Sequence, residues 1–551
     1  MAAVGGRMES LERKRSLFGP DYFLLTVLAL VSVGIHGWLL EHTKVTARDS
    51  LGFGRYAYDF QSPESSLPDG PHPQRQKVDV VRAQQQHPGY PIAIWITAKF
   101  VRHTTDLSLP ESMLLAAQIA NAIAAVLLVV PMYLLGRMLF GRSVGFSAAL
   151  LFQVLPIPAR ITSDGLSEGV YLLAIGVSLL LAVRAVRRPG VGGFLATGLA
   201  VGASYLVRPE AMLLAAATGA VAAWLGFTRR WPRDLAAGRL TALAVGVALV
   251  AGPYMLVIQG FSNKPSLNHP IDPTGSPRER MLKGNAQAAP AIRGPLFAKW
   301  MSFEDETGLT GRVLWGIRAA AEETVKSLFY GPAIFAVAGL VFLRRRLSAE
   351  PGLWLLMLVA GLNAAGLVFL GTHKGYVSER HTVLLALIGC LFAAAALEPI
   401  AERLLGRLPK VGFFWAGKMG PPALLVILVG LALPATLKPM HANREGHKYA
   451  GIWLQKHLKH DDCLVDPFEW ALWYSERSMY YVPEDPPAEP PPVATYAVVD
   501  DKMRGDEHVR LPRWQQAKNI AADGRSEVVY HWPEDVPVDQ AKVKVYRLIR
   551  K

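Results

Sequence analysis

Cysteine is nearly absent from this sequence, and so are the short motifs typical of nucleotide and nucleic-acid binding. The 551 residues include two cysteines, Cys390 in an apolar block and Cys463 in the polar tail, and we expect no disulfide between them. No G-x-G-x-x-G follows a predicted strand of the tail and no G-x-x-x-x-G-K-[ST] occurs, so nucleotide binding is unsupported. Helix-turn-helix, zinc-finger and RNA-binding signatures are also missing. Since the arginines behind the net charge of +14 recur between apolar blocks, we expect no nucleic-acid partner.

Apolar residues, in contrast, make up 51% of the chain, whose mean hydropathy is +0.23. They gather into blocks of roughly 18 to 25 residues, the length needed to span about 30 Å of hydrocarbon. A membrane barrel would show short alternating segments instead. The sequence therefore predicts an all-α polytopic membrane protein with about eleven transmembrane helices, at residues 22–40, 112–136, 143–158, 165–183, 191–207, 210–227, 239–258, 326–343, 352–371, 381–398 and 419–437.

Basic residues are distributed unequally between the two sets of short loops. One set holds clusters such as Arg184, Arg187, Arg188 and Arg344, Arg345, Arg346, whereas the other holds only Arg160, Arg208, Lys374 and Arg380. Because basic loops stay in the cytoplasm, we expect a cytoplasmic N-terminus in a multi-pass protein of the inner (plasma) membrane. The first block lacks a cleavage site after it, and we interpret it as a retained helix. The loops 41–111 and 259–325 and the tail 438–551 then lie outside.

The sequence of the tail predicts a small extracytoplasmic α/β domain at residues 438–551. This domain follows the membrane domain, residues 1–437. Segments such as "DCLVD", "MYYVP", "TYAVVD", "EVVYHW" and "VKVYRLI" are typical of strands, and "YAGIWLQKHL", "EWALWYSE" and "RWQQAKNIA" are typical of helices. The cluster "EDPPAEPPP" indicates a flexible excursion. The loop from Gln259 has little periodicity and is either a functional lid or disordered.

Two polar clusters occur in the first outer loop. Asp49 follows the first span and precedes Tyr56; this segment is either an interfacial anchor with a solvated acid or a site of chemistry at the membrane face. His87 and Tyr90 belong to "QQQHPGYP", where two prolines and a glycine force a turn. The histidine is either part of a simple turn or a ligand contact.

Two further clusters precede or follow later spans on the same side. Asp164 and Glu168 share one helix face, either as caps of a helix N-terminus or as a carboxylate pair facing a polar cavity. Arg208 and Glu210 flank a proline in a tight turn and can pair with each other. The loop "GTHKGYVSERHT" concentrates positive charge on the outer side and indicates either a solvated loop or a phosphate site with lysine and arginine donors, at His373, Lys374, Tyr376, Arg380 and His381.

These pieces, in this order, resemble the GT-C glycosyltransferases that use polyprenyl-phosphate-linked sugars, in particular the protein O-mannosyltransferases and lipid A aminoarabinose transferases. "ARDSLGFGRYA" is similar to the acidic element after the first span, and "HPGYP", "RITSDGLSEGVYL" and "VRPEA" are similar to later elements. "SERHTVLLAL" resembles an "RY"-type element, with His381 in the place of tyrosine. The resemblance covers most of residues 20–437, and several members of the group end in an extracytoplasmic α/β domain.

The resemblance implies an inverting glycosyltransferase that moves a sugar from a polyprenyl-phosphate donor to an acceptor hydroxyl on a glycan, lipid or protein. Asp49 would be the general base; the donor phosphate would bind Lys374, Arg380, Arg208, His373, His381 and Tyr376; the sugar or acceptor would bind Asp164, Glu168, Glu210, His87, Tyr90 and Tyr56. We expect no required metal, although a divalent cation is compatible with the chemistry. A flippase of lipid-linked sugars would show related halves and broken helices at mid-membrane, and a non-catalytic assembly protein would leave the basic loop without a role.

Overall fold

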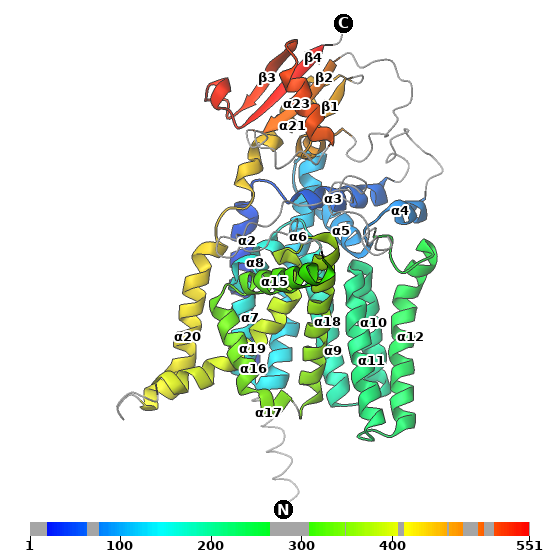
Figure 1. Ribbon diagram of the computed structural model, residues 1–551, viewed down its shortest axis with the longest axis vertical. Helices are drawn as coiled ribbons and strands as arrows, with labels where there is room; N and C mark the ends of the chain where they lie inside the picture. The colour runs from blue at the N-terminus through cyan, green and yellow to red at the C-terminus, as the bar shows by residue number, and fades with distance from the viewer. Residues whose placement is uncertain are drawn as a thin grey trace, which may run out of the picture.

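The protein consists of a helical bundle with a small sheet domain beyond one end of it (Figure 1). The computed structural model describes residues 19–62, 76–264, 308–347, 349–405, 413–459, 462–477, 494–500 and 512–549. The predicted strand "MYYVP", the cluster "EDPPAEPPP" and most of the loop after Lys264 lie outside these residues.

Eight helices of the described chain are long and apolar enough to cross a membrane, or up to ten if each of two bent pairs is one span. The eight lie in α2 (Gly19–Glu41), α6 (Leu109–Phe140), α9 (Glu168–Arg187), η2 (Pro209–Ala211) with α11 (Met212–Phe227), α12 (Arg233–Ile258), α18 (Pro351–Lys374), η4 (Glu379–Thr382) with α19 (Val383–Leu405), and α20 (Phe413–Thr436). A shorter apolar helix, α10 (Val191–Val207), packs against α12 and α9. The all-α membrane fold is therefore confirmed, but eleven full-length spans are not.

The two bent pairs have identifiable causes. Helix α7 (Arg142–Val154) meets α8 (Pro156–Ser163) at 66°, because Leu155 precedes a proline and takes an extended conformation (φ −64°, ψ 134°). Helix α15 (Leu309–Ser327) meets α16 (Gly331–Phe342) at 107°, because Phe329 and Tyr330 both have positive φ, 52° and 55°. The span predicted at residues 326–343 corresponds to the last residues of α15 and to α16, and the break between the two helices falls inside it; only α16 follows the bundle (Figure 1).

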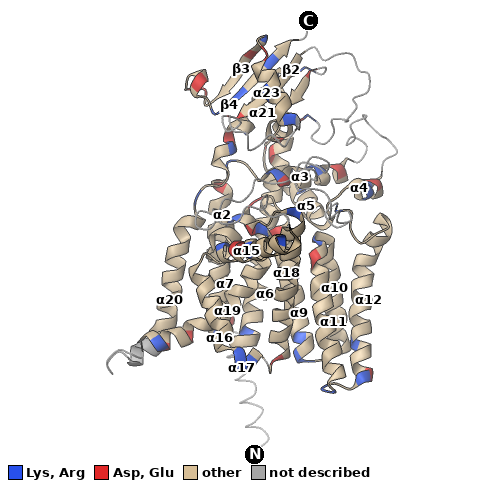
Figure 2. Cartoon of the chain, viewed as in Figure 1, with Lys and Arg blue, Asp and Glu red and all other residues tan. Residues whose placement is uncertain are grey.

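The segments predicted as outer loops also contain helices. The first loop forms α3 (Arg48–Gln61), α4 (Lys77–Ala83) and α5 (Gly89–Thr104), and the second includes most of α15. All four lie near the end of the bundle that faces the sheet domain (Figure 1). The arginine-rich turn α17 (Arg344–Leu347) lies at the opposite end, where Figure 2 shows further Lys and Arg residues.

The tail forms a four-stranded sheet of order β1-β2-β4-β3, with β1 parallel to β2 and the other neighbours antiparallel. Side chains alternate between its faces: Val498 packs with α21, whereas Ala497 packs with α23. The elements are η5 (Ala442–Arg444), α21 (Glu445–His457), β1 (Cys463–Val465), α22 (Trp470–Tyr474), β2 (Ala494–Asp500), α23 (Pro512–Ala522), β3 (Ser526–Trp532), η8 (Val538–Gln540) and β4 (Val543–Ile549). The predicted α/β domain is confirmed.

Helix α22 joins the sheet domain to the bundle. The indole N–H of Trp470 donates to the carbonyl of Thr46, and that of Trp473 donates to the carbonyl of Pro110, both at 3.1 Å. Arg48, the first residue of α3, forms an ion pair of 2.8 Å with Glu469. The start of α3 is therefore fixed from the sheet domain as well as from the bundle.

Candidate functional site

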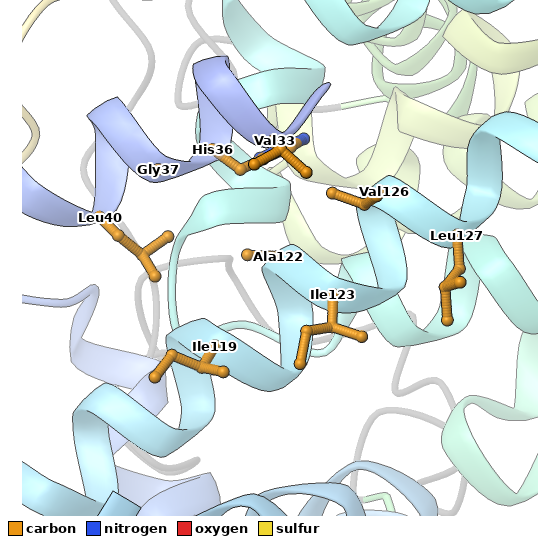
Figure 3. Close-up of a pocket in the computed structure, with 9 residues that line it drawn as sticks. All are labelled: Val33, His36, Gly37, Leu40, Ile119, Ala122, Ile123, Val126 and Leu127. Atoms are coloured by element: carbon orange, nitrogen blue, oxygen red, sulfur yellow. The ribbon is translucent and has the colours of Figure 1, made fainter. Parts of the chain in front are cut away.

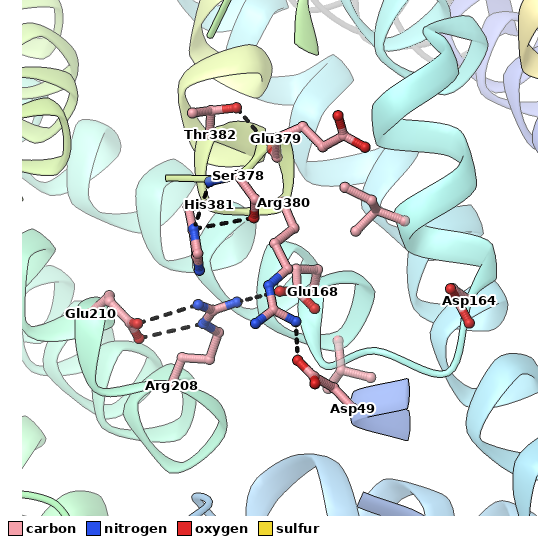
Figure 4. A network of polar contacts seen from close by, with 12 residues as sticks. Asp49, Asp164, Glu168, Arg208, Glu210, Ser378, Glu379, Arg380, His381 and Thr382 are labelled. Atoms are coloured by element: carbon pink, nitrogen blue, oxygen red, sulfur yellow. Dashed lines mark hydrogen bonds and ion pairs between the residues drawn. The ribbon is translucent and has the colours of Figure 1, made fainter. Parts of the chain in front are cut away.

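A network of charged side chains connects α3, α9, η2 and η4 (Figure 4). Asp49 stands in the first turn of α3, where the positive end of the helix dipole favours an acid. Its carboxylate pairs with the guanidinium of Arg380, from η4, although the two residues are 331 positions apart. The Asp49 side chain keeps 47% of its surface exposed, so a substrate can reach it.

Arg208, between α10 and η2, is the centre of the second half of the network. Its Nη1 donates to Glu168 at 2.7 Å, and its Nε and Nη2 donate to the two oxygens of Glu210 at 3.4 and 3.3 Å. The Nζ of Lys264 lies 3.6 Å from the same carboxylate. The guanidinium also lies 5.4 Å from the centre of the Tyr171 ring. This arrangement holds a partly buried arginine in one orientation.

The network contains three carboxylates, of Asp49, Glu168 and Glu210, and three cations, so that its formal charge is balanced. Three buried polar atoms nevertheless have no hydrogen-bond partner within the described residues: Oε2 of Glu168, Nε of Arg380 and the hydroxyl of Tyr171. Because buried polar groups are almost always paired, these atoms are available to a bound ligand.

His381 lies beside Arg208 (Figure 4). The backbone N–H of Ser378 donates to its Nδ1 at 3.2 Å, which leaves Nε2 as the protonated nitrogen of the neutral ring. The ring of Tyr376 meets that of His381 edge to face, with centroids 5.7 Å apart. The turn is held on α15 by the hydroxyl of Thr382, which lies 2.6 Å from that of Ser327.

Lys264 is the member of the network that the sequence did not indicate. Its backbone N–H donates to the hydroxyl oxygen of Ser262 at 3.2 Å. That hydroxyl lies 3.0 Å from Nε2 of His87, whose Nδ1–H donates to the carbonyl of Tyr205 at 2.8 Å. Burial, and then the nearby Lys264, lowers the pKa of His87 to about 4, so the ring is neutral and Nε2 accepts the hydrogen bond. The "HPGYP" element thus positions Lys264. In the sequence, Lys264 is only a single lysine shortly after a predicted span, which does not indicate a binding residue.

Asp164, predicted beside Glu168 in sugar or acceptor binding, has a different environment in the structure. Its Oδ1 accepts the backbone N–H of Ala47 at 2.9 Å and of Gly165 at 2.7 Å, and its Oδ2 lies 2.8 Å from Nε2 of His441. Figure 4 shows its carboxylate apart from the network. Asp164 therefore joins the residue before α3 to the start of the tail.

Four other predicted ligands are also placed outside the network. Tyr56 is buried against Phe60, and burial raises the pKa of its hydroxyl. The buried Tyr90 donates to the carbonyl of Ala117 at 3.0 Å. His373 lies 2.8 Å from the carbonyl of Phe369, one helical turn before it, and Lys374 is exposed at the end of α18.

No group of three or more His, Cys, Asp or Glu side chains in the described segments is placed to hold a metal ion. A groove of about 300 Å³ lies elsewhere, between α2 and α6 (Figure 3). Its lining is apolar except for His36 and contains no member of the charged network. The lining residues are Val33, His36, Gly37, Leu40, Ile119, Ala122, Ile123, Val126 and Leu127. Val33 and Ile123 are more than half exposed, as expected of side chains that face lipid.

Comparison with known proteins agrees with this architecture. The structure of ArnT from Cupriavidus metallidurans bound to undecaprenyl phosphate is similar with a TM-score of 0.56 and 12% identity, over 96% of this chain and 97% of that chain. The oligosaccharyltransferase of Archaeoglobus fulgidus in complex with zinc and sulfate is similar with a TM-score of 0.50 and 14% identity, over 85% of this chain. This chain spans 59% of the length of that enzyme.

The sequence comparisons are narrower. No curated protein sequence matches the chain. Residues 86–255 match the model of the family described as dolichyl-phosphate-mannose-protein mannosyltransferase, and this range includes His87, Glu168, Arg208 and Glu210. The resemblance found in the sequence motifs is therefore confirmed, and the chain is a multi-pass membrane protein with the fold of the GT-C glycosyltransferases.

Proposed function

We propose that the protein is an inverting glycosyltransferase that transfers a sugar from a polyprenyl-phosphate donor to an acceptor hydroxyl on the extracytoplasmic side of the membrane. The observation that carries the proposal is the placement of an accessible carboxylate, Asp49, against Arg380, in a network that also holds Arg208 and Lys264. A displacement at an anomeric carbon needs this pairing of a base with cations for the leaving phosphate.

The side of the membrane is inferred from the charges. The arginine-rich turn α17 lies at the end of the bundle opposite the sheet domain (Figure 2). Arg137 near the end of α6 and Arg142 at the start of α7 pair with Asp21 at the start of α2. Because positively charged short loops stay in the cytoplasm, the network and the sheet domain face outward.

In the reaction, an oxygen of the acceptor forms a bond to the anomeric carbon, and the bond from that carbon to the phosphate oxygen breaks. The bonding pair leaves with the phosphate, and the hydroxyl proton passes to Asp49. The donor phosphodiester carries one negative charge and the released polyprenyl phosphate carries more, so nearby guanidinium and ammonium groups stabilise the transition state more than the bound donor. A direct displacement inverts the anomeric centre.

The Asp49–Arg380 pair implies that the donor binds before the Asp49 carboxylate is released to act as a base. While the pair is intact, the carboxylate is engaged and Arg380 is partly neutralised. A donor phosphate that binds Arg380 competes with Asp49 for the guanidinium and releases the carboxylate towards the acceptor. Glu168 and Glu210 are held by Arg208 and belong to the walls that orient the donor rather than to the base.

The test is transfer in vitro from a panel of polyprenyl-phosphate sugars, comparing the parent with Asp49→Asn. Loss of a general base should lower the rate by about 10²- to 10⁴-fold. Asp106→Asn is the matched control, because Asp106 is an exposed aspartate on the same side. Equal transfer by Asp49→Asn and the parent would exclude the base assignment. Movement of the donor across the membrane without a glycosylated product would instead indicate a flippase.

A further inference from the structure

Helix α5 exposes an apolar stripe near the outer ends of the spans. One face is buried through Tyr90 and Ile94, whereas Ile92, Ile96 and Phe100 follow each other at one-turn intervals with exposures of 37, 60 and 67%. The helix contacts α3, α6 and α10 and lies at the end of the bundle nearest the sheet domain (Figure 1). An apolar stripe at this level of a membrane protein contacts lipid at the boundary between headgroups and acyl chains.

Two lysines lie beside this stripe and share one aromatic ring. The Nζ of Lys99 is 4.1 Å from the centroid of Trp95 and that of Lys77, from α4, is 4.8 Å from it. Both lysines are exposed, and neither has a carboxylate partner among the described residues. Lys77 also stands in the first turn of α4, where the helix dipole opposes a positive charge. Asp79 in the same turn is engaged in the capping box of α4, so the two ammonium groups lie at one ring without an ion pair to either of them in the described part of the chain.

We propose that Lys77, Trp95 and Lys99 bind the headgroup of an anionic phospholipid, whose acyl chains lie against Ile96 and Phe100. The charge complementarity is specific: two ammonium groups attract a phosphate that carries a negative charge, and a tryptophan at headgroup level orders the contact. The continuous apolar stripe favours a lipid over a soluble phosphate, because a soluble anion would leave Ile96 and Phe100 without a partner. The site is separate from the Asp49 network and does not depend on the proposed reaction.

The experiment is a lipid-binding titration of the full chain in detergent, followed by native mass spectrometry. Phosphatidylglycerol and phosphatidylcholine with identical acyl chains are added separately to the parent and to the Lys77→Gln/Lys99→Gln double variant. Each lysine near an anionic surface contributes about a fivefold gain in affinity, so the double variant should bind phosphatidylglycerol about 25-fold more weakly. Its binding of phosphatidylcholine should be unchanged.

The matched control is Lys456→Gln/Lys542→Gln, which removes the same charge from exposed positions of the sheet domain, one of them also over a tryptophan. This control should bind both lipids like the parent. Equal affinity of the parent for the two lipids, an unchanged affinity of the Lys77/Lys99 variant for phosphatidylglycerol, or the same loss in the control would overturn the proposal. Displacement of the lipid by an equal concentration of glycerol 3-phosphate would show that the site binds phosphate alone and would also overturn it.

Discussion

Replacing Arg208 by glutamine removes the guanidinium that holds the carboxylates of Glu168 and Glu210. Glu168 is 3% exposed and lies 2.7 Å from Arg208, so the replacement leaves a buried carboxylate without its cation. At an effective dielectric constant of about 20, the Coulomb energy at this distance is about 6 kcal/mol, of which desolvation of the two ions cancels a large part. Breaking a buried pair by removing one partner typically costs about 3 to 5 kcal/mol, and we expect Arg208→Gln to fall in this range.

The assay is a thermal unfolding series of the purified protein in detergent, monitored by the fraction that remains monodisperse. Arg208→Gln should lower the apparent melting temperature by several degrees. Glu168→Gln/Arg208→Gln should recover part of the loss, because the second change removes the unpaired charge. Arg208→Lys should be intermediate, because an ammonium keeps the charge but not the forked contact with Glu210. An unchanged melting temperature of Arg208→Gln, or a double variant no more stable than the single one, would refute this reasoning.

Three further predictions concern the segment that carries Lys264 and the turn that supports it. Lys264→Gln should raise the KM for a polyprenyl-phosphate sugar by about tenfold with a smaller change in kcat, because the proposed donor-phosphate site loses one cation; an unchanged KM in steady-state transfer would contradict this proposed role. Burial lowers the pKa of His87 from 6.5 to about 4, so the folded state disfavours protonation of this ring. The neutral ring therefore contributes about 3 kcal/mol to the free energy of unfolding above pH 6.5, and this contribution should be lost as the pH falls towards 4. His87→Asn should lack this part of the pH dependence when melting is compared from pH 7.5 to 4, and identical slopes for the two proteins would contradict it. Gly89→Ala should destabilise the protein by about 1 to 3 kcal/mol, since a Cβ would lie 2.7 Å from the carbonyl oxygen of Leu206; an unchanged melting temperature would show that α5 and α10 separate easily.

Much of the membrane fold is predictable because apolar length alone identifies a span. The limits of α6, α12 and α18 contain the predicted segments, and α9 begins three residues after its predicted start; the order of the described helices and strands in the tail also follows from periodicity. The bends were not predictable to the same degree. The turn at Phe329 and Tyr330 depends on left-handed backbone conformations at two aromatic residues, for which the sequence carries no signal.

The charged network was predicted only in part, for reasons of distance and local context. Charge on the outer side indicated Asp49, Glu168, Arg208, Glu210 and Arg380, and the structure brings these five together. The roles of these residues as base, phosphate ligand or sugar and acceptor ligands stay predictions.

Other assignments depended on contacts that adjacency in the sequence cannot show. The pairing of Asp164 with His441 joins residues 277 positions apart, so its separation from Glu168 was not visible in "SDGLSE". Lys264 stands in a segment without periodicity, and its place depends on a histidine from a distant turn.

The contacts of Asp164 have a consequence for the sheet domain. The same carboxylate accepts the backbone N–H of Ala47, the residue before α3, and lies 2.8 Å from Nε2 of His441, near the start of the tail. A chain cut before His441 would lose one of the partners that orient this carboxylate, together with the Trp470 and Glu469 contacts to the start of α3. The helix that carries Asp49 is therefore held by contacts from the tail as well as from the bundle, and we predict that removal of the sheet domain would shift the Asp49 carboxylate relative to Arg380.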